Sequence, residues 1–441
     1  MAAHKPENGG VFSWFIHSQV AGSVVLLSAA VLALILANTP LRDFYKTVAH
    51  LDLGFVIAGA SYTLHLDHWV KDGLMAIFFF VVGLEIKREL VAGELSSFDK
   101  AILPVGAAVG GALVPALIYL SFNSSGPEAR GWAVPMATDI AFALGVLAMF
   151  GKRVPIGLKV FLTALAIADD LLAVIVIALF YTAKIDFVGL IVAVAFMAAI
   201  FGANRFGVRP GWIYFVLAFG AWAGVLVSGV HATIAGVLVA LLVPVTGRIE
   251  PSDFLERART RLGALETSGL TKRSMIEDHD QLNAIDDLHE AAADLRPPGL
   301  TLEHALHPVQ SFLVVPLFAL FAAGVPLNLG AIGGGKGTIA FAIILGLVAG
   351  KLIGVTGASY LIVKSGRASL PAGVTWPQIV GASMLAGIGF TMSIFIAELG
   401  FIDEVMVNAA KIGILVASVT AGILGYLMLN RVLPKANADA T

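Results

Sequence analysis

Long apolar runs alternate with short polar segments along almost the whole chain. A helix needs about 17–25 predominantly apolar residues to cross the hydrocarbon core of a bilayer. The stretch 211–245 holds 35 residues, too many for one crossing, so its interruption at Ser228 and Gly229 favours two helices. The pattern therefore predicts twelve membrane-spanning helices, at 14–37, 70–90, 101–122, 131–150, 156–182, 187–204, 211–227, 229–245, 307–329, 338–363, 376–400 and 405–430.

The composition supports a polytopic membrane protein. Of 441 residues, 58% are hydrophobic and 13% are charged, about half of the ~25% charged content of soluble domains. The 47 glycines suit close packing of helices in lipid. The chain has no cysteine, which excludes disulfides, thiol catalysis and cysteine-ligated metals. A net charge of -2 indicates no nucleic-acid partner, and no opening segment has the pattern of a cleaved signal peptide.

The loop charges predict the orientation. With both termini in the cytoplasm, 20 of the 28 lysines and arginines lie on the cytoplasmic side, six lie outside and two lie within spans. Long loops are weak evidence under the positive-inside rule. Without the seven basic residues of the segment 246–306, the ratio is still 13 to 6. We therefore expect both termini to be cytoplasmic.

Two segments depart from a simple bundle. The apolar and polar residues of 61–67 alternate as in a strand, and with 50–53 they predict a small external β-hairpin; an irregular loop fits the pattern equally well. The polar segment 246–306 forms a long cytoplasmic loop. Within it we predict a helix over 252–266, with Ser252 as its N-cap, and an acidic helix over 275–295.

Two adjacent aspartates, Asp169 and Asp170, lie in the middle of the fifth predicted span. One ionised carboxylate at the centre of a bilayer costs roughly 2.5–3.5 kcal/mol on insertion scales. Such residues face a bundle interior or a water-filled cavity, and they mark ion and proton pathways. The pair is therefore the first candidate for the functional site.

Two other spans contain residues that interrupt a helix. Pro135 removes a backbone hydrogen bond in the fourth span, and Thr138 and Asp139 follow it with polar oxygens. The alternative is a helix that begins at Pro135 and is capped by Thr138 and Asp139. The eleventh span has two glycines and two hydroxyls within 387–393. Interrupted segments in corresponding positions of two halves indicate a transporter site near the midplane.

The tenth span contains Lys351, about thirteen residues from either end. At 1.5 Å per residue this is roughly 20 Å from each surface, beyond easy snorkelling. Its expected partners are the carboxylates or the negative ends of broken helices, and a purely structural ion pair is the alternative. Lys411 lies near the outer end of its span, where it snorkels or pairs.

Several titratable residues lie at span ends. Glu85, Arg88 and Glu89 form the rim of a charged funnel or a plain positive-inside anchor. His231 is a packed histidine or a pH sensor. Glu303, His304 and His307 are expected on the cytoplasmic side. With unperturbed pKa values, side chains of this kind change charge in a pH range useful for regulation.

The adjacent carboxylates suggest antiport. Because two neighbouring charges repel each other, the pair binds protons as a coupled unit. Deprotonated, it offers hard oxygen ligands to a small cation, and protonated, it binds one poorly. If both acids exchange their protons for one monovalent ion, net charge moves; alternatively, Lys351 carries one of the two protons. An ion channel would need no such pair, and an intramembrane aspartyl protease would need a Gly-x-Gly-Asp motif that the chain lacks.

Six segments together resemble the NhaA-type Na⁺/H⁺ antiporters: FFFVVGLEIKREL at 78–90, ATDIAFALG at 137–145, ALAIADDLLAVIVIALFYT at 164–182, SGVHATIAGV at 228–237, LEHALHP at 302–308 and GIGFTMSIFIA at 387–397. The resemblance implies a single all-α transporter domain over 1–441. That family has inverted repeats with two discontinuous crossing helices. The implied core repeats are 101–182 and 338–430, and the implied interface part is 11–92 and 187–329.

The resemblance also implies a secondary active transporter, not an enzyme, in the bacterial inner membrane. It would exchange Na⁺ or Li⁺ for protons by alternating access, electrogenically, with pH activation and without a cofactor. Asp169 and Asp170 would bind the ion and protons, supported by Thr138, Asp139 and Lys351. The hairpin 50–67 would form a homodimer. The residues assigned to pH regulation are Glu85, Arg88, Glu89, His231, Glu303 and His304, although the 246–306 loop is longer than expected for the family.

Overall fold

The computed structural model describes residues 19–57, 60–182, 186–208, 211–268, 279–326 and 337–434. Helices lie in each of the twelve predicted ranges. They are α2 (Gln19–Ala37), α5 (Met75–Ala92), α6 (Phe98–Phe122), α7 (Ile140–Ala148) after a 3-10 helix η2 (Pro127–Met136), α8 (Ile156–Phe180), α9 (Phe187–Arg205), α10 (Gly211–Val227), α11 (Ala232–Leu242), α15 (Pro298–Val309) with η4 (Gln310–Val314) and α16 (Val315–Ala322), α17 (Gly337–Leu345) with η6 (Gly346–Gly350) and α18 (Lys351–Lys364), α19 (Trp376–Leu385) with α20 (Phe390–Gly400), and α21 (Glu404–Val432).

Among the described residues, eight helices are long and apolar enough to cross a membrane, or nine if the bent pair α19–α20 is one span. The other three predicted spans coincide with helices that fall short of this test. α10 and α11 are apolar but short, and α5 carries Glu85, Lys87, Arg88 and Glu89 in its last two turns. The molecule is therefore a helical, multi-pass membrane protein with a broken helix pair.

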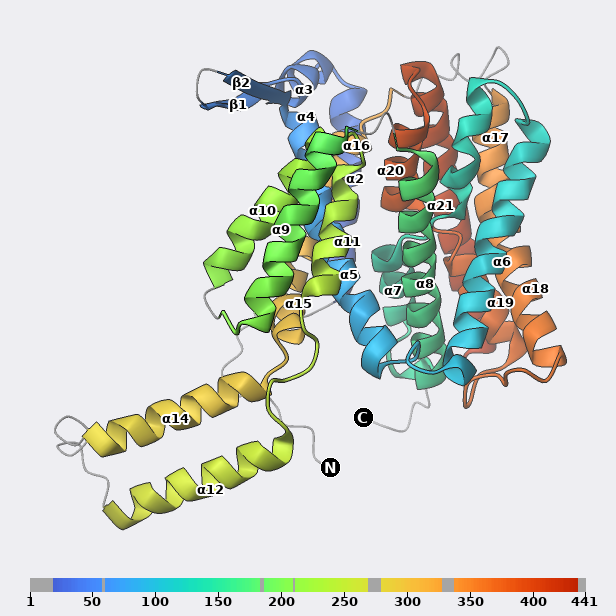
Figure 1. The fold of residues 1–441 in the computed structure, drawn as a ribbon. Coiled ribbons are helices and arrows are strands. Elements are labelled where there is room, and N and C mark those ends of the chain that lie inside the picture. Colours follow the sequence, from blue (N-terminus) through green and yellow to red (C-terminus); the bar gives the residue numbers. More distant parts are fainter. Residues whose placement is uncertain are drawn as a thin grey trace.

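The helices form two groups (Figure 1). One contains α2, α5, α9, α10, α11, α15 and α16; the other contains α6, α7, α8 and α17 to α21. Within the second group, α6 packs closely along α18. A side chain at Gly110 would collide with the Gly354 carbonyl and Ala358 on α18, so glycine at this crossing permits the contact. The largest cluster of buried apolar side chains includes residues of both groups.

A two-stranded sheet lies at one end of the first group, next to α3 (Arg42–Ala49) and α4 (Leu66–His68) (Figure 1). β1 (Asp52–Ile57) and β2 (Ala60–His65) are antiparallel, with Asp52 opposite His65 and Ile57 opposite Ala60. The residues 58–59 between the strands lie outside the described part. A π-helical turn, η1 (Trp69–Leu74), connects α4 to α5.

Two helices of the segment 246–306 project from the opposite end (Figure 1). α12 (Pro251–Ser268) and α14 (His279–Leu295) pack against each other, and an ion pair joins Arg261 to Asp287 at 2.5 Å. The prediction that Ser252 is the N-cap is wrong, because the helix already begins at Pro251, whose fixed φ suits the first helical position. The first residues of the predicted acidic helix, 275–278, lie outside the described residues.

The ninth span also begins earlier than predicted. The apolar run starts near 307, but α15 begins at Pro298 and continues through η4 into α16. Proline at the first helical position again marks the start of the helix. The last three predicted residues of this span, 327–329, are not among the described ones.

Candidate functional site

The adjacent aspartates lie on an unbroken helix. α8 spans 25 residues, and Asp169 and Asp170 are each only 2% exposed. The apolar neighbours Ala166, Ile167 and Ala173 are equally buried. The energetic cost of this position must therefore be offset by partners of the two carboxylates.

Lys351 is one such partner. It is the first residue of α18, directly after the π-helical turn η6, and it is 1% exposed. Its Nζ donates a hydrogen bond of 2.8 Å to Oδ2 of Asp169. π-helical turns occur frequently at functional sites, and this one immediately precedes the lysine. The structure thus pairs Lys351 with a carboxylate, one of the two kinds of partner expected for it.

The two interrupted spans meet beside this pair. η2 ends at Met136, and α7 begins at Ile140 with Asp139 as its N-cap. The alternative that a helix begins at Pro135 is wrong, because Pro135 lies inside the 3-10 helix and the break follows it at 137–139. α19 and α20 are separated by 386–389 and differ in direction by 48°.

Each break supplies hydrogen bonds to the other. The Asp139 N–H donates to the Ile388 carbonyl at 2.6 Å, and the Thr138 hydroxyl donates to the Ala386 carbonyl at 2.8 Å. In return, the Ser393 hydroxyl donates to the Val134 carbonyl at 2.9 Å. Irregular backbone at membrane depth must be satisfied within the protein, and these bonds satisfy the Asp139 N–H and the carbonyls of Ile388, Ala386 and Val134.

Asp139 is the centre of this crossing. Its Oδ1 accepts from the Phe142 N–H on α7 at 3.1 Å. Its Oδ2 accepts from both the hydroxyl and the N–H of Thr391, the latter at 3.1 Å, at the start of α20. Two helix N-termini, each with a positive dipole end, therefore converge on one carboxylate. Sequence reasoning named Asp139 but missed Thr391 as its partner.

Two carboxylate oxygens of the aspartate pair accept no hydrogen bond from the described residues. Oδ1 of Asp169 and Oδ2 of Asp170 are buried and have no hydrogen-bond partner among the residues that the structure describes. Buried unpaired acceptors of this kind need an explanation such as an ion or proton. Hard carboxylate oxygens are suitable ligands for a small alkali cation. The geometry is thus compatible with a site that holds either a cation or protons.

The predicted pH-regulation residues fall into two separate places. Arg88 on α5 lies 3.3 Å from Glu89, 3.8 Å from Glu85 and 3.4 Å from Glu303 on α15. His304 follows Glu303 in sequence and is exposed. His231, by contrast, precedes α11 and makes an edge-on contact with Phe395 of α20 at 6.5 Å, so it does not join the Arg88 cluster.

One partly buried carboxylate was missed by sequence reasoning. Glu398, near the end of α20, accepts a hydrogen bond from Lys411 at 2.7 Å, which realises the pairing alternative for this lysine. The available signal was a lone carboxylate in the apolar run FIAELG, thirteen residues before a lysine.

Comparisons with known proteins identify the family of the chain. A family model described as Na⁺/H⁺ antiporter 1 matches residues 13–429. The chain is 43% identical to the Na⁺/H⁺ antiporter NhaA of Sulfurimonas denitrificans, over 97% of this chain and 96% of that protein. It is 43% identical to NhaA 2 of Helicobacter hepaticus over 98% of both chains, and 42% identical to NhaA 1 of Saccharophagus degradans over 95% and 91%. The chain belongs to the NhaA family of Na⁺/H⁺ antiporters.

Proposed function

We propose that this Na⁺/H⁺ antiporter binds its cation and its protons in turn at Asp169 and Asp170. The observation that carries the proposal is the burial of two adjacent carboxylates with one unpaired oxygen each, beside two crossed helix breaks. The cation, Na⁺ or Li⁺, is the transported substrate, and no resident cofactor takes part.

Lys351 competes with the cation in this scheme. Because its Nζ bonds to Oδ2 of Asp169, a cation that uses both oxygens of Asp169 displaces the ammonium. Binding of a cation to the pair is thereby coupled to movement of α18 or loss of a proton from Lys351. Two protons are exchanged for one cation. They are released either by both aspartates or by one aspartate and Lys351, and net charge crosses the membrane in both cases. Transport is electrogenic.

The architecture that we propose for this exchange has twelve crossings and both termini in the cytoplasm of a bacterial inner membrane. The repeats 101–182 and 338–430 form the core, and 11–92 with 187–329 form the interface part; the two groups of helices in Figure 1 support this division. Alternating access then consists of movement of the core against the interface part. The sheet of the 50–67 hairpin lies outside and pairs with a second copy to form a homodimer.

We further propose that activity rises with pH through the Arg88 cluster. Glu85, Glu89 and Glu303 surround one guanidinium, so the net charge of the cluster depends on how many carboxylates are protonated. His304 follows Glu303 directly in the sequence and belongs to the same proposed regulatory region. His231 acts separately, because it lies against α20.

Everted membrane vesicles test the site. A dye reports the proton gradient while Na⁺, Li⁺ or K⁺ is added. We expect Na⁺ and Li⁺, but not K⁺, to collapse the gradient, and we expect Asp169→Asn and Asp170→Asn to abolish the response. Asp99→Asn, an exposed aspartate in the first turn of α6, is the matched control and retains it. Unchanged responses in both site variants would refute the assignment.

A further inference from the structure

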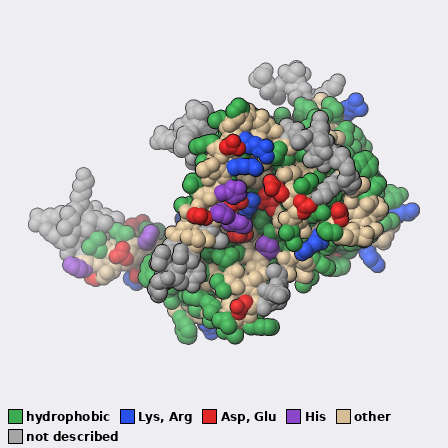
Figure 2. Space-filling model, turned by 90° about the horizontal axis from the view of Figure 1, so that it is seen from above, with side chains coloured by type: hydrophobic (Ala, Val, Ile, Leu, Met, Phe, Trp, Pro, Cys, Tyr) green, Lys and Arg blue, Asp and Glu red, His purple; other side chains and the backbone are tan. Residues whose placement is uncertain are grey.

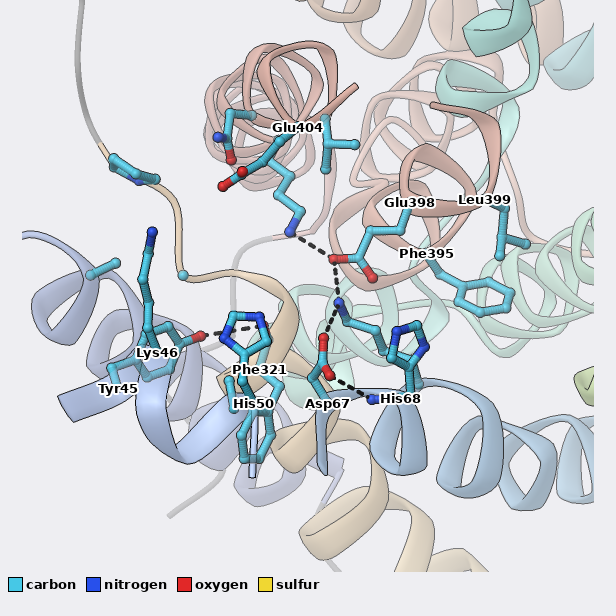
Figure 3. A pocket seen from close by; sticks show the side chains of 18 of the residues that line it. Tyr45, Lys46, His50, Asp67, His68, Phe321, Phe395, Glu398, Leu399 and Glu404 are labelled. Atoms are coloured by element: carbon cyan, nitrogen blue, oxygen red, sulfur yellow. Dashed lines mark hydrogen bonds and ion pairs between the residues drawn. The ribbon is translucent and has the colours of Figure 1, made fainter. Parts of the chain in front are cut away.

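A charged pocket of about 750 Å³ opens at the end of the molecule that carries the hairpin. Seen from that end, acidic, basic and histidine side chains gather in one region (Figure 2). Its lining comes from both helix groups, with Asp67 and Lys71 from α4 and η1, and with Glu398 and Lys411 from α20 and α21 (Figure 3). The pocket therefore lies where the proposed core and the proposed interface part meet.

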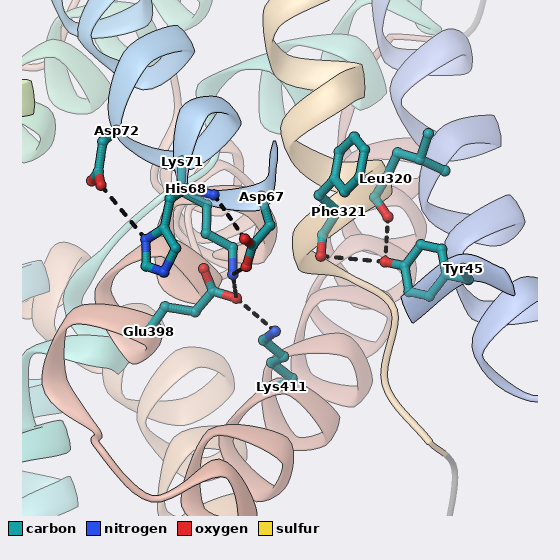
Figure 4. Close-up of polar contacts among 9 residues, drawn as sticks. All are labelled: Tyr45, Asp67, His68, Lys71, Asp72, Leu320, Phe321, Glu398 and Lys411. Atoms are coloured by element: carbon teal, nitrogen blue, oxygen red, sulfur yellow. Dashed lines mark hydrogen bonds and ion pairs between the residues drawn. The ribbon is translucent and has the colours of Figure 1, made fainter. Parts of the chain in front are cut away.

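Four of these side chains form a continuous chain of ion pairs (Figure 4). Oε1 of Glu398 lies 2.7 Å from Nζ of Lys411 and 3.2 Å from Nζ of Lys71. Lys71 also lies 3.3 Å from Oδ2 of Asp67. The Glu398 side chain is 12% exposed and that of Lys411 is 9% exposed. Within this chain of ion pairs, the contact between Glu398 and Lys71 is the one that crosses from one helix group to the other.

The contact is placed to affect the ion site through α20. This helix has eleven residues; Thr391 at its start bonds to Asp139, and Glu398 lies seven residues later. At 1.5 Å per residue the two positions are roughly 10 Å apart along the helix axis. A short rigid helix transmits a displacement from one end to the other, so the position of Glu398 biases the position of Thr391.

A group of aromatic rings lies at the pocket, where the two helix groups touch. Phe395 is among the lining residues of the pocket, whereas Asp139, Asp169 and Asp170 are not. The Phe395 ring contacts Phe79 of α5 at 5.6 Å and Phe318 of α16 at 6.1 Å, and it is 1% exposed. Phe79 and Phe318 belong to the first helix group and Phe395 to the second, so separation of the groups at this point would break both ring contacts.

We propose that Glu398 is a positioning residue for transport: by bridging Lys71 and Lys411 it holds α20 against η1 and keeps the passage from the outer pocket to Asp139 closed. The proposal rests on the proposed function, because it assumes alternating access to the Asp169–Asp170 site. Release of the bridge favours the state that is open to the outer pocket.

Electrostatics gives the expected direction for each variant. Both ammonium nitrogens lie on one carboxylate oxygen and are at most about 6 Å apart. In Glu398→Gln the ammonium groups of Lys71 and Lys411 face each other without their shared anion. Their repulsion pushes η1 away from α20 and α21. Lys71→Gln removes only the link between the groups. Lys411→Gln leaves that link intact and removes a pair within α20–α21, so it has a smaller effect.

Cysteine labelling measures the opening directly, since the chain contains no native cysteine. Ser393→Cys places a nearly isosteric thiol on α20 between Thr391 and Phe395, where Ser393 is fully buried. Asn408→Cys places a thiol in the pocket itself. A membrane-impermeant methanethiosulfonate reagent is added on the pocket side of the full-length protein in proteoliposomes. Each cysteine variant is labelled once alone and once in combination with Glu398→Gln.

We expect Glu398→Gln to raise the rate of labelling at Ser393→Cys by about fivefold or more, a usual size for conformational coupling. Labelling at Asn408→Cys stays unchanged. Lys71→Gln raises the Ser393→Cys rate as well, and Lys411→Gln raises it less. Glu404→Gln, which changes the charge of another pocket carboxylate, is the matched control and leaves the rate unchanged.

Transport gives the second measurement. We expect Glu398→Gln to lower the apparent KM for Na⁺ on the pocket side and to raise it on the opposite side. Equal labelling in Glu398→Gln and Glu404→Gln, or a larger effect of Lys411→Gln than of Lys71→Gln, would overturn the proposal. If Glu398→Gln does not fold, the Lys71→Gln and Lys411→Gln comparison decides alone. Loss of transport in Asp169→Asn with unchanged labelling in Glu398→Gln would leave the ion site standing and remove the positioning role.

Discussion

Replacement of Lys351 by methionine tests whether its ion pair with Asp169 is a necessary partner for a buried charge. Lys351 and Asp169 are 1% and 2% exposed, and their charged atoms are 2.8 Å apart. Removal of one partner of a buried pair costs about 3–5 kcal/mol, because the remaining charge has no compensation. We therefore expect Lys351→Met to lower the free energy of unfolding by about that amount.

The double variant separates pairing from packing. In Lys351→Met/Asp169→Asn neither charge remains, and replacement of both partners of a buried pair is often close to neutral. The double variant should therefore be more stable than Lys351→Met alone. Lys364→Met, an exposed lysine at the far end of α18, is the matched control and should change stability by less than about 0.5 kcal/mol.

Equilibrium unfolding in mixed micelles, followed by the fluorescence of the six tryptophans, provides the free energies of unfolding of the native protein, Lys351→Met, Asp169→Asn and the double variant. The same experiment with Na⁺ tests the competition between lysine and cation. Since Na⁺ need not displace an ammonium in Lys351→Met, we expect Na⁺ to stabilise this variant more than the native protein. A Lys351→Met protein as stable as the native one, or a double variant less stable than the single one, would refute the reasoning.

Three further predictions concern other parts of the molecule. Thr391→Val removes the hydroxyl bond to Asp139, so it should destabilise the protein by about 1–3 kcal/mol and reduce Na⁺-dependent collapse of the proton gradient, whereas Thr391→Ser keeps the hydroxyl and retains activity. Burial raises the pKa of Tyr45 to about 12; its stabilising contribution should therefore be constant below pH 10 and disappear between about pH 10 and 12, and the difference in ultraviolet titration between the native protein and Tyr45→Phe measures this pKa. Replacement of 252–294 by a short flexible linker should preserve vesicle transport, because α12 and α14 project away from the bundle (Figure 1); loss of transport would show that this hairpin takes part in the cycle.

The helices could be predicted from the sequence because apolar runs of membrane length have few alternative structures. Their exact ends were harder, since the helix begins at Pro298 within a polar stretch where hydropathy gives no signal. The number of crossings is also not given by helix length, because α10 and α11 are short for a span. Whether helices as short as α10 and α11 cross the membrane depends on how they pack against neighbouring helices, and not on their own length.

The residues of the candidate site could be named from the sequence, but their contacts could not. A buried lysine and buried carboxylates must compensate each other, but the sequence does not indicate which carboxylate Lys351 contacts, and in the structure it is Asp169. Glu398 was missed for a related reason. Its partner Lys71 is more than three hundred residues away in sequence, and Lys71 itself resembled an ordinary residue at the start of a span.

The polar contacts of α20 connect the two proposals, because this helix contacts Asp139 at its start and η1 near its end. The first two N–H groups of this helix have no partner within the helix; that of Phe390 bonds to the Ser418 hydroxyl and that of Thr391 to Asp139. A cation or proton that changes the charge near Asp139 therefore changes what binds the helix at its start. At the other end, Glu398 binds α20 to η1. The same helix is held at both ends by charged groups. In the proposed mechanism, ion binding and closure of the charged pocket therefore depend on one rigid element, and a change at either end alters the free energy of the contact at the other.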